Sequence, residues 1–446
     1  MLRHGCNPVY PELSLKRRQC SPEEEKGVNV IMERKVLPIR DQAQLFDEAL
    51  RDRLDNLLPQ LMERQNISMW IVMNREYNED PVYLSMVPMM ARYARRLSCL
   101  IFHRDANGRV ERYCLGNDRD FKGMYTVIPW APPVDRMELL RETIEKLNPE
   151  NIALDFCADN QFADGLSKGI YDMFAAAMTP EIMAKVISAE HIVTDWLQTR
   201  TRQELVRYRA VNRLAQEILE EAFSSRVITP GVTTTADVEW CLMEAVSIHG
   251  LECWFTPTVD LQRKFNPSGR IRDEIILPGD ILHCDFGLKY LGLCTDTQRI
   301  YYVPYPGETE PPEYLQRAYE KTLRFMDIVA ENCIAGRKGD EILVNSVQQA
   351  KDEGLRPHLY THPIGVHGHA AGPTIGLYYK DGPVGGMGEY PLYPNTCYAL
   401  ELNTKVSIPE WKDEEVWIMR EETVCFKHDG ELEYLMEDHD VFKLVK

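Results

Sequence analysis

Apolar residues recur with helical or extended spacing along the first half of the chain. Between residues 41 and 65, leucines follow a helical period, which predicts an amphipathic helix. Apolar runs predict strands at 68–74, 96–104 and 150–156. A turn sequence and an alternating segment follow the second of these runs, so the pair should form a hairpin. With a further helix near 163–178, this half has the pattern of an α/β unit.

The second half of the chain combines a few long helices with many short strands. Helical patterns occur at 201–225, 234–250, 312–334 and 339–353. Threonines after a Pro–Gly break offer a cap for the second of these helices. The remaining apolar runs are short, and strands that follow helices within one segment are typical of an α+β domain.

These patterns predict three parts. Residues 1–31 are polar and carry no periodicity, so they should form a flexible extension, although translation could also begin at Met32. Residues 32–190 are predicted to form an α/β N-terminal domain, and residues 195–446 an α+β domain. The length of 446 residues is sufficient for both.

Composition narrows the classes of protein that the chain can belong to. A hydrophobic content of 44% with 27% charged residues is that of an ordinary globular protein. The net charge of −18 argues against nucleic acid as a partner. The sequence contains no run of eighteen apolar residues and no secretory signal, so no membrane partner is expected. Twelve cysteines without a C-x-x-C pair indicate reduced thiols and a cytoplasmic location.

Two aspartates lie inside strand-like runs that should pair with each other. Asp285 and Asp296 flank a short link at 289–292, and carboxylates opposed across a hairpin repel one another. A shared proton, an arginine or a metal ion could neutralise them. Arg299 is close enough in sequence for a structural Asp–Arg network, which is the simpler alternative to a metal site.

Further carboxylates and histidines in the second half favour the metal. Residues 358–373 contain four of the chain's eleven histidines, at positions 358, 362, 367 and 369. Glu401 lies within an apolar strand-like run, and Glu421 and Glu422 lie within another. Carboxylates with one histidine form an oxygen-rich ligand set that suits two divalent cations of the Mn, Co, Zn or Fe kind.

The order of these residues resembles that of the pita-bread metallopeptidases, the family of methionine aminopeptidase, Xaa-Pro aminopeptidase and prolidase. The matching segments are Asp285-Phe286-Gly287, Asp296-Thr297-Gln298-Arg299, His362, Glu401 in ALEL and Glu421 in REETV. The resemblance covers about 195–446, and 32–190 looks like the N-terminal domain of the Xaa-Pro branch. It implies the creatinase/aminopeptidase fold for the second domain.

The resemblance also implies roles for individual residues. Asp285 would bind one metal, Asp296 and Glu421 would bridge both, and His362 and Glu401 would complete the other site. Manganese is the first expectation, with cobalt, zinc or iron as alternatives. The implied catalytic residues are His358, His369 and Glu401: the histidines would donate protons or stabilise an oxyanion, and Glu401 would take a proton from a metal-bridging water.

Several positions depart from the family pattern or have no counterpart in it. The histidine expected upstream of the first aspartate is missing from 255–270, and His283 is the one candidate replacement, although a core role is commoner for such a residue. Met419 stands where the Xaa-Pro branch has an arginine, with Arg420 on the opposite face. His367 has no counterpart and should lie at the surface. These departures bear on the preference for proline.

The expected function is hydrolysis of small peptides by an Xaa-Pro aminopeptidase or dipeptidase that depends on two metal ions. The alternatives are a metal-dependent hydrolase of another amide or C–N bond, and a binding protein without catalysis. Residues 74–81 should form a solvated loop. The alternative is that they line the substrate site. Members of this branch commonly form dimers or larger assemblies, so a homodimer or larger homo-oligomer is expected.

Overall fold

The computed structural model describes residues 35–116, 121, 123–266 and 269–446. The extension predicted at 1–31 lies outside them. The boundaries predicted at 32–190 and 195–446 stay a prediction. No helix in the described part of the chain is long and apolar enough to cross a membrane.

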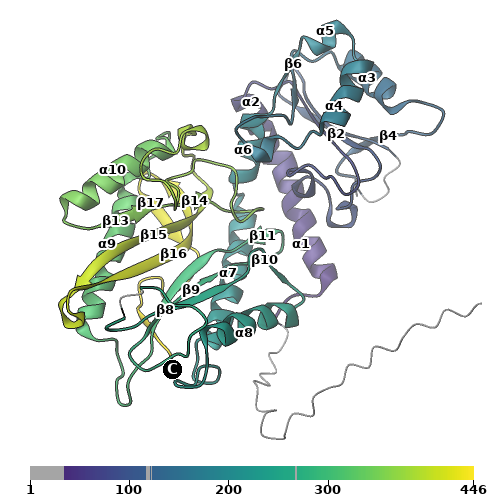
Figure 1. Ribbon diagram of the computed structural model, residues 1–446. Helices are drawn as coiled ribbons and strands as arrows, with labels where there is room; N and C mark the ends of the chain where they lie inside the picture. Colours follow the sequence, from purple (N-terminus) through teal and green to yellow (C-terminus); the bar gives the residue numbers. More distant parts are fainter. Residues whose placement is uncertain (1–34, 117–120, 122, 267–268) are drawn as a thin grey trace, which may run out of the picture. The chain divides into compact units, whose positions relative to one another are not determined.

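A six-stranded mixed sheet with the order β4-β3-β2-β1-β5-β6 organises the first part of the chain (Figure 1). Its strands are β1 Met69–Asn74, β2 Ser98–Arg104, β3 Val110–Leu115, β4 Thr126–Ile128, β5 Ile152–Leu154 and β6 Val186–Ser188. The helices around it are α3 Arg136–Leu147, α4 Lys168–Ala177, α5 Pro180–Met183 and α6 Glu190–Gln198. The antiparallel pairing of β2 with β3 confirms the predicted hairpin.

Alternation along β1 explains why helices cover both faces of this sheet. Met69 and Ile71 pack in one apolar cluster with residues of α3 and α4. Trp70 and Val72 point the other way, into a cluster that includes Trp196 of α6. A strand buried on both faces has a continuous apolar sequence, as this one does.

The helix predicted at 41–65 is present but is interrupted. It runs as α1 Ile39–Asp52, a π-helical turn at Arg53–Leu57 and α2 Leu58–Arg64. At the interruption, the buried guanidinium of Arg53 donates hydrogen bonds at 2.7 Å to Glu204 and to the carbonyl oxygen of Thr199. Burial opposes ionisation of Glu204, yet Arg200 and Arg53 lower its pKa to about 2. Glu204 therefore stays charged and joins α1 to the helix that carries it.

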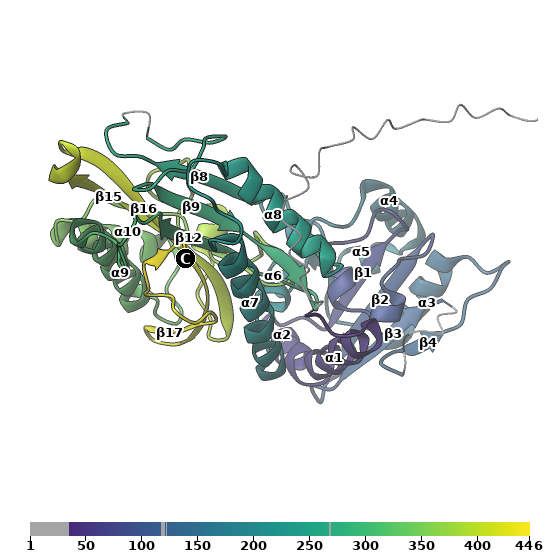
Figure 2. The same ribbon diagram turned by 90° about the horizontal axis from the view of Figure 1, so that it is seen from below.

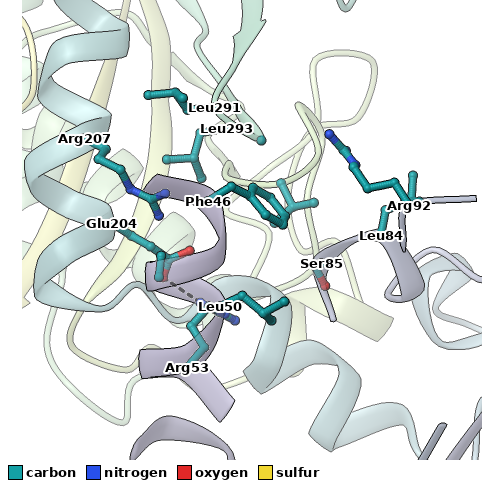
Figure 3. Close-up of a pocket in the computed structure, with 13 residues that line it drawn as sticks. Phe46, Leu50, Arg53, Leu84, Ser85, Arg92, Glu204, Arg207, Leu291 and Leu293 are labelled. Atoms are coloured by element: carbon teal, nitrogen blue, oxygen red, sulfur yellow. Dashed lines mark hydrogen bonds and ion pairs between the residues drawn. The ribbon is translucent and has the colours of Figure 1, made fainter. Parts of the chain in front are cut away.

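A small pocket borders this ion pair (Figure 3). Phe46 and Leu50 of α1 face Leu293 across it. Gly292 has a φ of +79°, and a Cβ there would lie 2.9 Å from the Phe46 ring. The pocket measures about 30 Å³, which is too small for a peptide, and it contains none of the predicted metal ligands.

We expect replacement of Glu204 by glutamine to destabilise the fold. The change leaves two buried guanidinium groups without their shared carboxylate, and breaking a buried ion pair costs about 3–5 kcal/mol in the free energy of unfolding. Urea denaturation measures the change in the free energy of unfolding, with the exposed Glu320→Gln in the helix Glu313–Asn332 (α9) as the matched control. Equal midpoints for the two variants would contradict the structural role of Glu204.

A nine-stranded sheet forms the second part, with the path β13-β15-β16-β12-β9-β8 and three further strands paired to it. Its strands are β8 Thr258–Gln262, β9 Ile281–Phe286, β12 Thr297–Tyr302, β13 Pro357–Leu359, β14 His362–Pro363, β15 Thr396–Ile408, β16 Glu414–His428, β17 Glu431–Tyr434 and β18 Lys443–Leu444. A small sheet contains β7 Glu252–Cys253, β10 Leu288–Tyr290 and β11 Leu293–Cys294.

The four helices predicted in this part are confirmed. They are α7 Arg202–Ala222, α8 Thr235–Ile248, α9 Glu313–Asn332 and α10 Gly339–Asp352. The predicted threonine cap is also present, because Thr234 and Asp237 form a capping box at the start of α8. Short 3₁₀ turns occur at Tyr83–Ser85, Met89–Ala91, Gln161–Ala163, Gly386–Glu389 and Pro409–Trp411.

The long strands β15 and β16 set the two faces of this sheet. Leu400 and Leu402 pack with Phe325 of α9 and Ile342 of α10 in one apolar cluster. Figure 2 shows these two helices side by side along the strands. Because side chains alternate along a strand, Glu401, which lies between these leucines, points to the opposite face. The packing of α9 and α10 therefore decides where its carboxylate lies.

The hairpin with the two aspartates differs from the prediction. The paired strands β10 and β11 shorten the expected link at 289–292 to the two residues Leu291 and Gly292. Asp285 lies opposite Gln298 in the β9–β12 ladder, and Asp296 precedes β12 rather than facing Asp285. The two aspartates are therefore not a directly opposed pair.

Candidate metal centre

The structure brings all five predicted metal ligands together. Ligand atoms of Asp296, His362 and Glu421 lie within 4.8 Å of one another, and so do those of Asp285, Glu401 and Glu421. Glu421 belongs to both groups. Two neighbouring positions that share one carboxylate are the arrangement expected for a pair of cations.

Strand pairing explains this convergence. Gln298 lies opposite Asp285 on one side and Glu421 on the other, and Glu421 lies opposite Glu401. Three carboxylates therefore form one row across four neighbouring strands. His362 begins β14 and pairs with Ala399, two residues before Glu401 on the same face. Asp296 joins the row from the turn before β12.

Burial makes these carboxylates costly as anions. Burial raises the pKa of Asp285 to about 7, with a further contribution from Asp296. It also raises the pKa of Asp296, Glu401 and Glu421 well above the ordinary range. Within the described residues, no donor reaches Asp285 Oδ1, Asp296 Oδ1 or either carboxylate oxygen of Glu421. Buried oxygen atoms without donors fit a cation in the space between them.

The orientation of His362 supports the same conclusion. Its Nδ1 lies 3.0 Å from the carbonyl oxygen of Pro363, which can only accept a hydrogen bond. Burial lowers the pKa of His362 to about 4, so the ring is neutral near pH 7. The proton therefore sits on Nδ1, and Nε2 directs its lone pair towards Asp296 Oδ2 at 3.5 Å and Glu421 Oε1 at 3.7 Å. A lone pair facing carboxylates is repulsive unless a cation or a proton lies between them.

Arg299 does not neutralise the aspartates. Its guanidinium binds both carboxylate oxygens of Glu422, one of them at 2.9 Å. Arg420 binds the same carboxylate and the carbonyl oxygen of His439. This ion cluster lies on the opposite face of β16 from Glu421, so the register places Glu421, and not Glu422, in the candidate centre.

The other histidines of the 358–373 segment have three different environments. His369 is exposed, and its ring centroid lies 4.6 Å from that of His362. His358 lies opposite Asn403, which follows Glu401 by two residues on β15. It belongs to neither ligand group. The expected surface position of His367 is wrong. It is half-buried against Phe162, with its Nε2 3.1 Å from the carbonyl oxygen of Pro81.

The 74–81 segment is exposed at 76–78, as predicted for a solvated loop, but is buried on either side of that stretch. Asn74 and Asp80 are buried, and Asp80 accepts a hydrogen bond at 2.9 Å from the backbone of Val82. Through Pro81 the segment contacts His367, two residues before His369. It therefore contacts the loop that carries His367 and His369.

His283 lies outside both ligand groups, yet it connects to one of them. Its Nε2 is 2.9 Å from Gln298 Oε1, and the amide nitrogen of Gln298 donates to Glu401. Its Nδ1 is 3.0 Å from Asp260 Oδ2, and Arg270 in turn donates to Asp260 at 2.9 Å. The chain of contacts fixes the orientation of Glu401. Sequence reasoning missed Gln298, although it lies within the Asp296–Arg299 motif.

Trp254 forms a wall beside His369 and was also missed. The two ring centroids are 5.3 Å apart, and the indole nitrogen donates to the carbonyl oxygen of Thr295 at 2.7 Å. A Cβ at Gly287 or Gly368 would lie 2.3 Å from the indole. The glycine of the Asp-x-Gly motif is therefore required to seat this ring, a contact that local sequence does not show.

We expect replacement of Gln298 by leucine to weaken metal binding about 10–100-fold, as the loss of groups that orient ligands does at other metal sites. The leucine cannot donate to Glu401, so the carboxylate loses its fixed orientation. Calorimetric titration with Mn²⁺ measures the affinity. Gln348→Leu, at an exposed position of α10, is the matched control. An affinity equal to that of the control would show that Gln298 does not orient the ligand.

Comparison with known proteins identifies relatives of this arrangement. The sequence profile of Metallopeptidase family M24 matches residues 206–428, which is half of the chain. Two proteins provisionally named Xaa-Pro aminopeptidases, from Mycoplasma pneumoniae and Mycoplasma genitalium, are each 26% identical over 159 residues. These matches cover 35% of this chain and 44% of each relative.

Solved structures share the fold over most of the chain. The X-Pro aminopeptidase of Thermotoga maritima has a TM-score of 0.61 at 18% identity, covering 86% of this chain and 99% of its own. The Xaa-Pro dipeptidase of Bacillus anthracis has a TM-score of 0.59 at 16% identity, covering 90% and 100%. These findings confirm the predicted α/β N-terminal domain and α+β pita-bread domain.

Proposed function

Because the chain belongs to metallopeptidase family M24, we propose that it is a metal-dependent exopeptidase for small peptides, with Xaa-Pro bonds as the preferred target. The observation that carries this proposal is the pair of ligand groups sharing Glu421. A binding protein without catalysis would have no need to gather four carboxylates beside a neutral histidine.

Asp285, Asp296, His362, Glu401 and Glu421 would hold two divalent cations, with manganese as the first candidate. Such a pair of cations supplies a nucleophilic water near neutral pH and polarises the scissile carbonyl. Asp285 and Glu401 are only partly buried, unlike the other three ligands, so substrate would approach from their side.

The protein's own side chains would handle the protons. Glu401, held by Gln298, would accept a proton from the attacking water and return it to the leaving amine. His369 stands beside His362 and is exposed, so its ring can donate a hydrogen bond to the oxygen that becomes negative in the transition state. His358 lies farther along the strands and would contact the substrate away from the scissile bond.

A peptide panel tests this proposal. Chelator-stripped protein is assayed with and without Mn²⁺ on Ala-Pro, Ala-Pro-Ala, Ala-Ala and peptides with blocked N-termini. We expect metal-restored cleavage of the unblocked peptides, with Xaa-Pro bonds cleaved fastest. Cleavage that does not need metal, or no cleavage of any peptide in the metal-loaded protein, would contradict it.

A second candidate function is hydrolysis of another amide or C–N bond. The buried Met419 occupies the position at which the Xaa-Pro branch is expected to have an arginine, on the same face of β16 as Glu421. Arg420 is held on the opposite face by Glu422. The same panel therefore includes N-acyl amino acids and simple amides. Cleavage of these compounds by metal-loaded protein that leaves every peptide intact would favour this alternative.

A further inference from the structure

A second cavity lies beside the candidate metal centre. It has a volume of about 570 Å³, enough for one or two amino-acid residues. Its walls include His358, Tyr378 and Trp417, and Asn403 also lines it. The aromatic rings provide an apolar surface for the carbon skeleton of a ligand.

The cavity continues the sheet face that carries the metal ligands. Asn403 follows Glu401 by two residues on β15, so the two side chains share one face at a spacing of about 7 Å. Its Nδ2 donates to the hydroxyl of Tyr360 at 3.0 Å, and the backbone nitrogen of Tyr360 donates to the carbonyl oxygen of Glu401 at 3.1 Å. A substrate placed at the centre would therefore reach this cavity within one or two residues.

The charge of the cavity is opposite to that of the protein. The chain carries a net charge of −18, yet four cationic side chains and one carboxylate, Asp381, line this space. The cationic residues are Lys351, Arg356, Lys380 and Lys405. A local excess of positive charge attracts anionic ligands.

Lys405 follows Asn403 by two residues on β15, so it shares a sheet face with Asn403 and Glu401. Its ammonium lies 4.3 Å from the centroid of the Trp417 ring, and within the described residues it forms no ion pair. Arg356, in contrast, is engaged by Glu415, and the ammonium of Lys380 donates to the carbonyl oxygen of Val384 at 3.1 Å.

Asn403 adds a second, independent sign of a ligand. It is fully buried at the boundary between the cavity and Glu401, and no donor in the described part of the chain reaches its Oδ1. An unpaired buried amide oxygen costs free energy unless something else donates to it. The N–H group of a bound peptide is such a donor.

We propose that this cavity binds a carboxylate of the substrate at Lys405 and the adjoining peptide N–H at Asn403. It thereby selects short peptides with a negative charge one or two residues from the scissile bond. The proposal deepens the exopeptidase function proposed above and rests on it. Either the C-terminal carboxylate or an acidic side chain can supply the charge.

Paired substrates and two lysine variants test the proposal. Ala-Pro-Ala is compared with Ala-Pro-Ala-NH₂ for the C-terminal carboxylate, because the N–H of the third residue adjoins that carboxylate, and Ala-Glu-NH₂ with Ala-Gln-NH₂ for an acidic side chain. Each pair is assayed with the native protein, with Lys405→Met and with Lys405→Arg. Lys321→Met, at an exposed position of α9, is the matched control.

We expect the native protein and Lys321→Met to favour the charged member of one pair through a lower KM. Lys405→Met should raise that KM about tenfold or more, leave kcat and the uncharged substrate almost unchanged, and be rescued in part by Lys405→Arg. The pair that responds identifies the source of the charge. Equal KM values within both pairs in the native protein, or a preference that persists in Lys405→Met, would overturn the proposal.

A binding measurement separates this proposal from the exopeptidase function. Metal-stripped protein is titrated calorimetrically with N-acetylalanine, N-acetylalanine amide, N-acetylglutamic acid amide and N-acetylglutamine amide. A carboxylate-specific affinity that Lys405→Met abolishes would support the anion site even if no peptide were cleaved. Equal affinities within both pairs would overturn it even if peptides were cleaved.

Discussion

Replacement of Glu421 by glutamine is expected to reduce kcat/KM about 1,000-fold or more. Glu421 is the one carboxylate shared by the two ligand groups, so its loss impairs both positions at once. Metal ions contribute several kcal/mol to the stabilisation of transition-state charge, and about 4 kcal/mol corresponds to three orders of magnitude in rate. Steady-state hydrolysis of Ala-Pro at saturating Mn²⁺ measures the effect.

The metal content of the same variant distinguishes this cause from misfolding. Glu421→Gln should be folded and bind less metal per chain than the native protein, whereas Glu431→Gln, at an exposed position of β17, should match the native protein in both rate and metal content. Full metal content together with native activity in Glu421→Gln would contradict the assignment of Glu421 as the shared ligand.

The stability of the metal-free protein is expected to fall between pH 5 and pH 8. Burial raises the pKa of Asp285 to about 7 and raises the pKa of Asp296, Glu401 and Glu421. The folded protein therefore retains protons that the unfolded chain releases near pH 4. The contribution of these protons to the free energy of unfolding is fully present below pH 4. It is lost as the pH rises through the raised pKa values of the folded protein.

Metal should reverse this loss because cations replace the protons. Mn²⁺ at a thousand times its dissociation constant adds about 4 kcal/mol to the free energy of unfolding, and less at pH 5, where protons compete for the same oxygens. Thermal unfolding at pH 5 and pH 8, with and without Mn²⁺, measures both effects.

Asp285→Asn is the informative variant for this pH dependence. Without metal it should be more stable than the native protein at pH 8, because it removes a buried negative charge, and its stabilisation by Mn²⁺ should be smaller. A metal-free protein whose melting temperature is the same at pH 5 and pH 8, in the native form and in Asp285→Asn, would show that the cluster is not protonated as argued.

Local sequence patterns predicted much of the fold and indicated the candidate ligands. Apolar alternation placed Glu401 and Glu421 on strands, and the packing of α9 and α10 against the intervening leucines turned their carboxylates to the free face. The Pro–Gly break and the threonine cap located the start of α8 to within one residue, whereas α7 ends three residues before the predicted position 225. These features depend on residues that are close in sequence.

Other features depend on pairing between distant segments and were therefore not predictable. The strands β10 and β11 shift Asp296 away from Asp285, because their pairing uses residues that had been assigned to a turn. Gln298 gains its role only when β12 lies between β9 and β16. His367 was placed at the surface because its partners, Pro81 and Phe162, lie more than 200 residues away.

The measurement that tests the central claim most directly is a titration of chelator-stripped protein with Mn²⁺, followed by the rate of Ala-Pro hydrolysis and the metal content per chain. We expect no activity without metal and a rate that rises until about two ions are bound, because two ligand groups share Glu421. Full activity in the stripped protein, or tight binding of two ions without hydrolysis of any peptide, would contradict it.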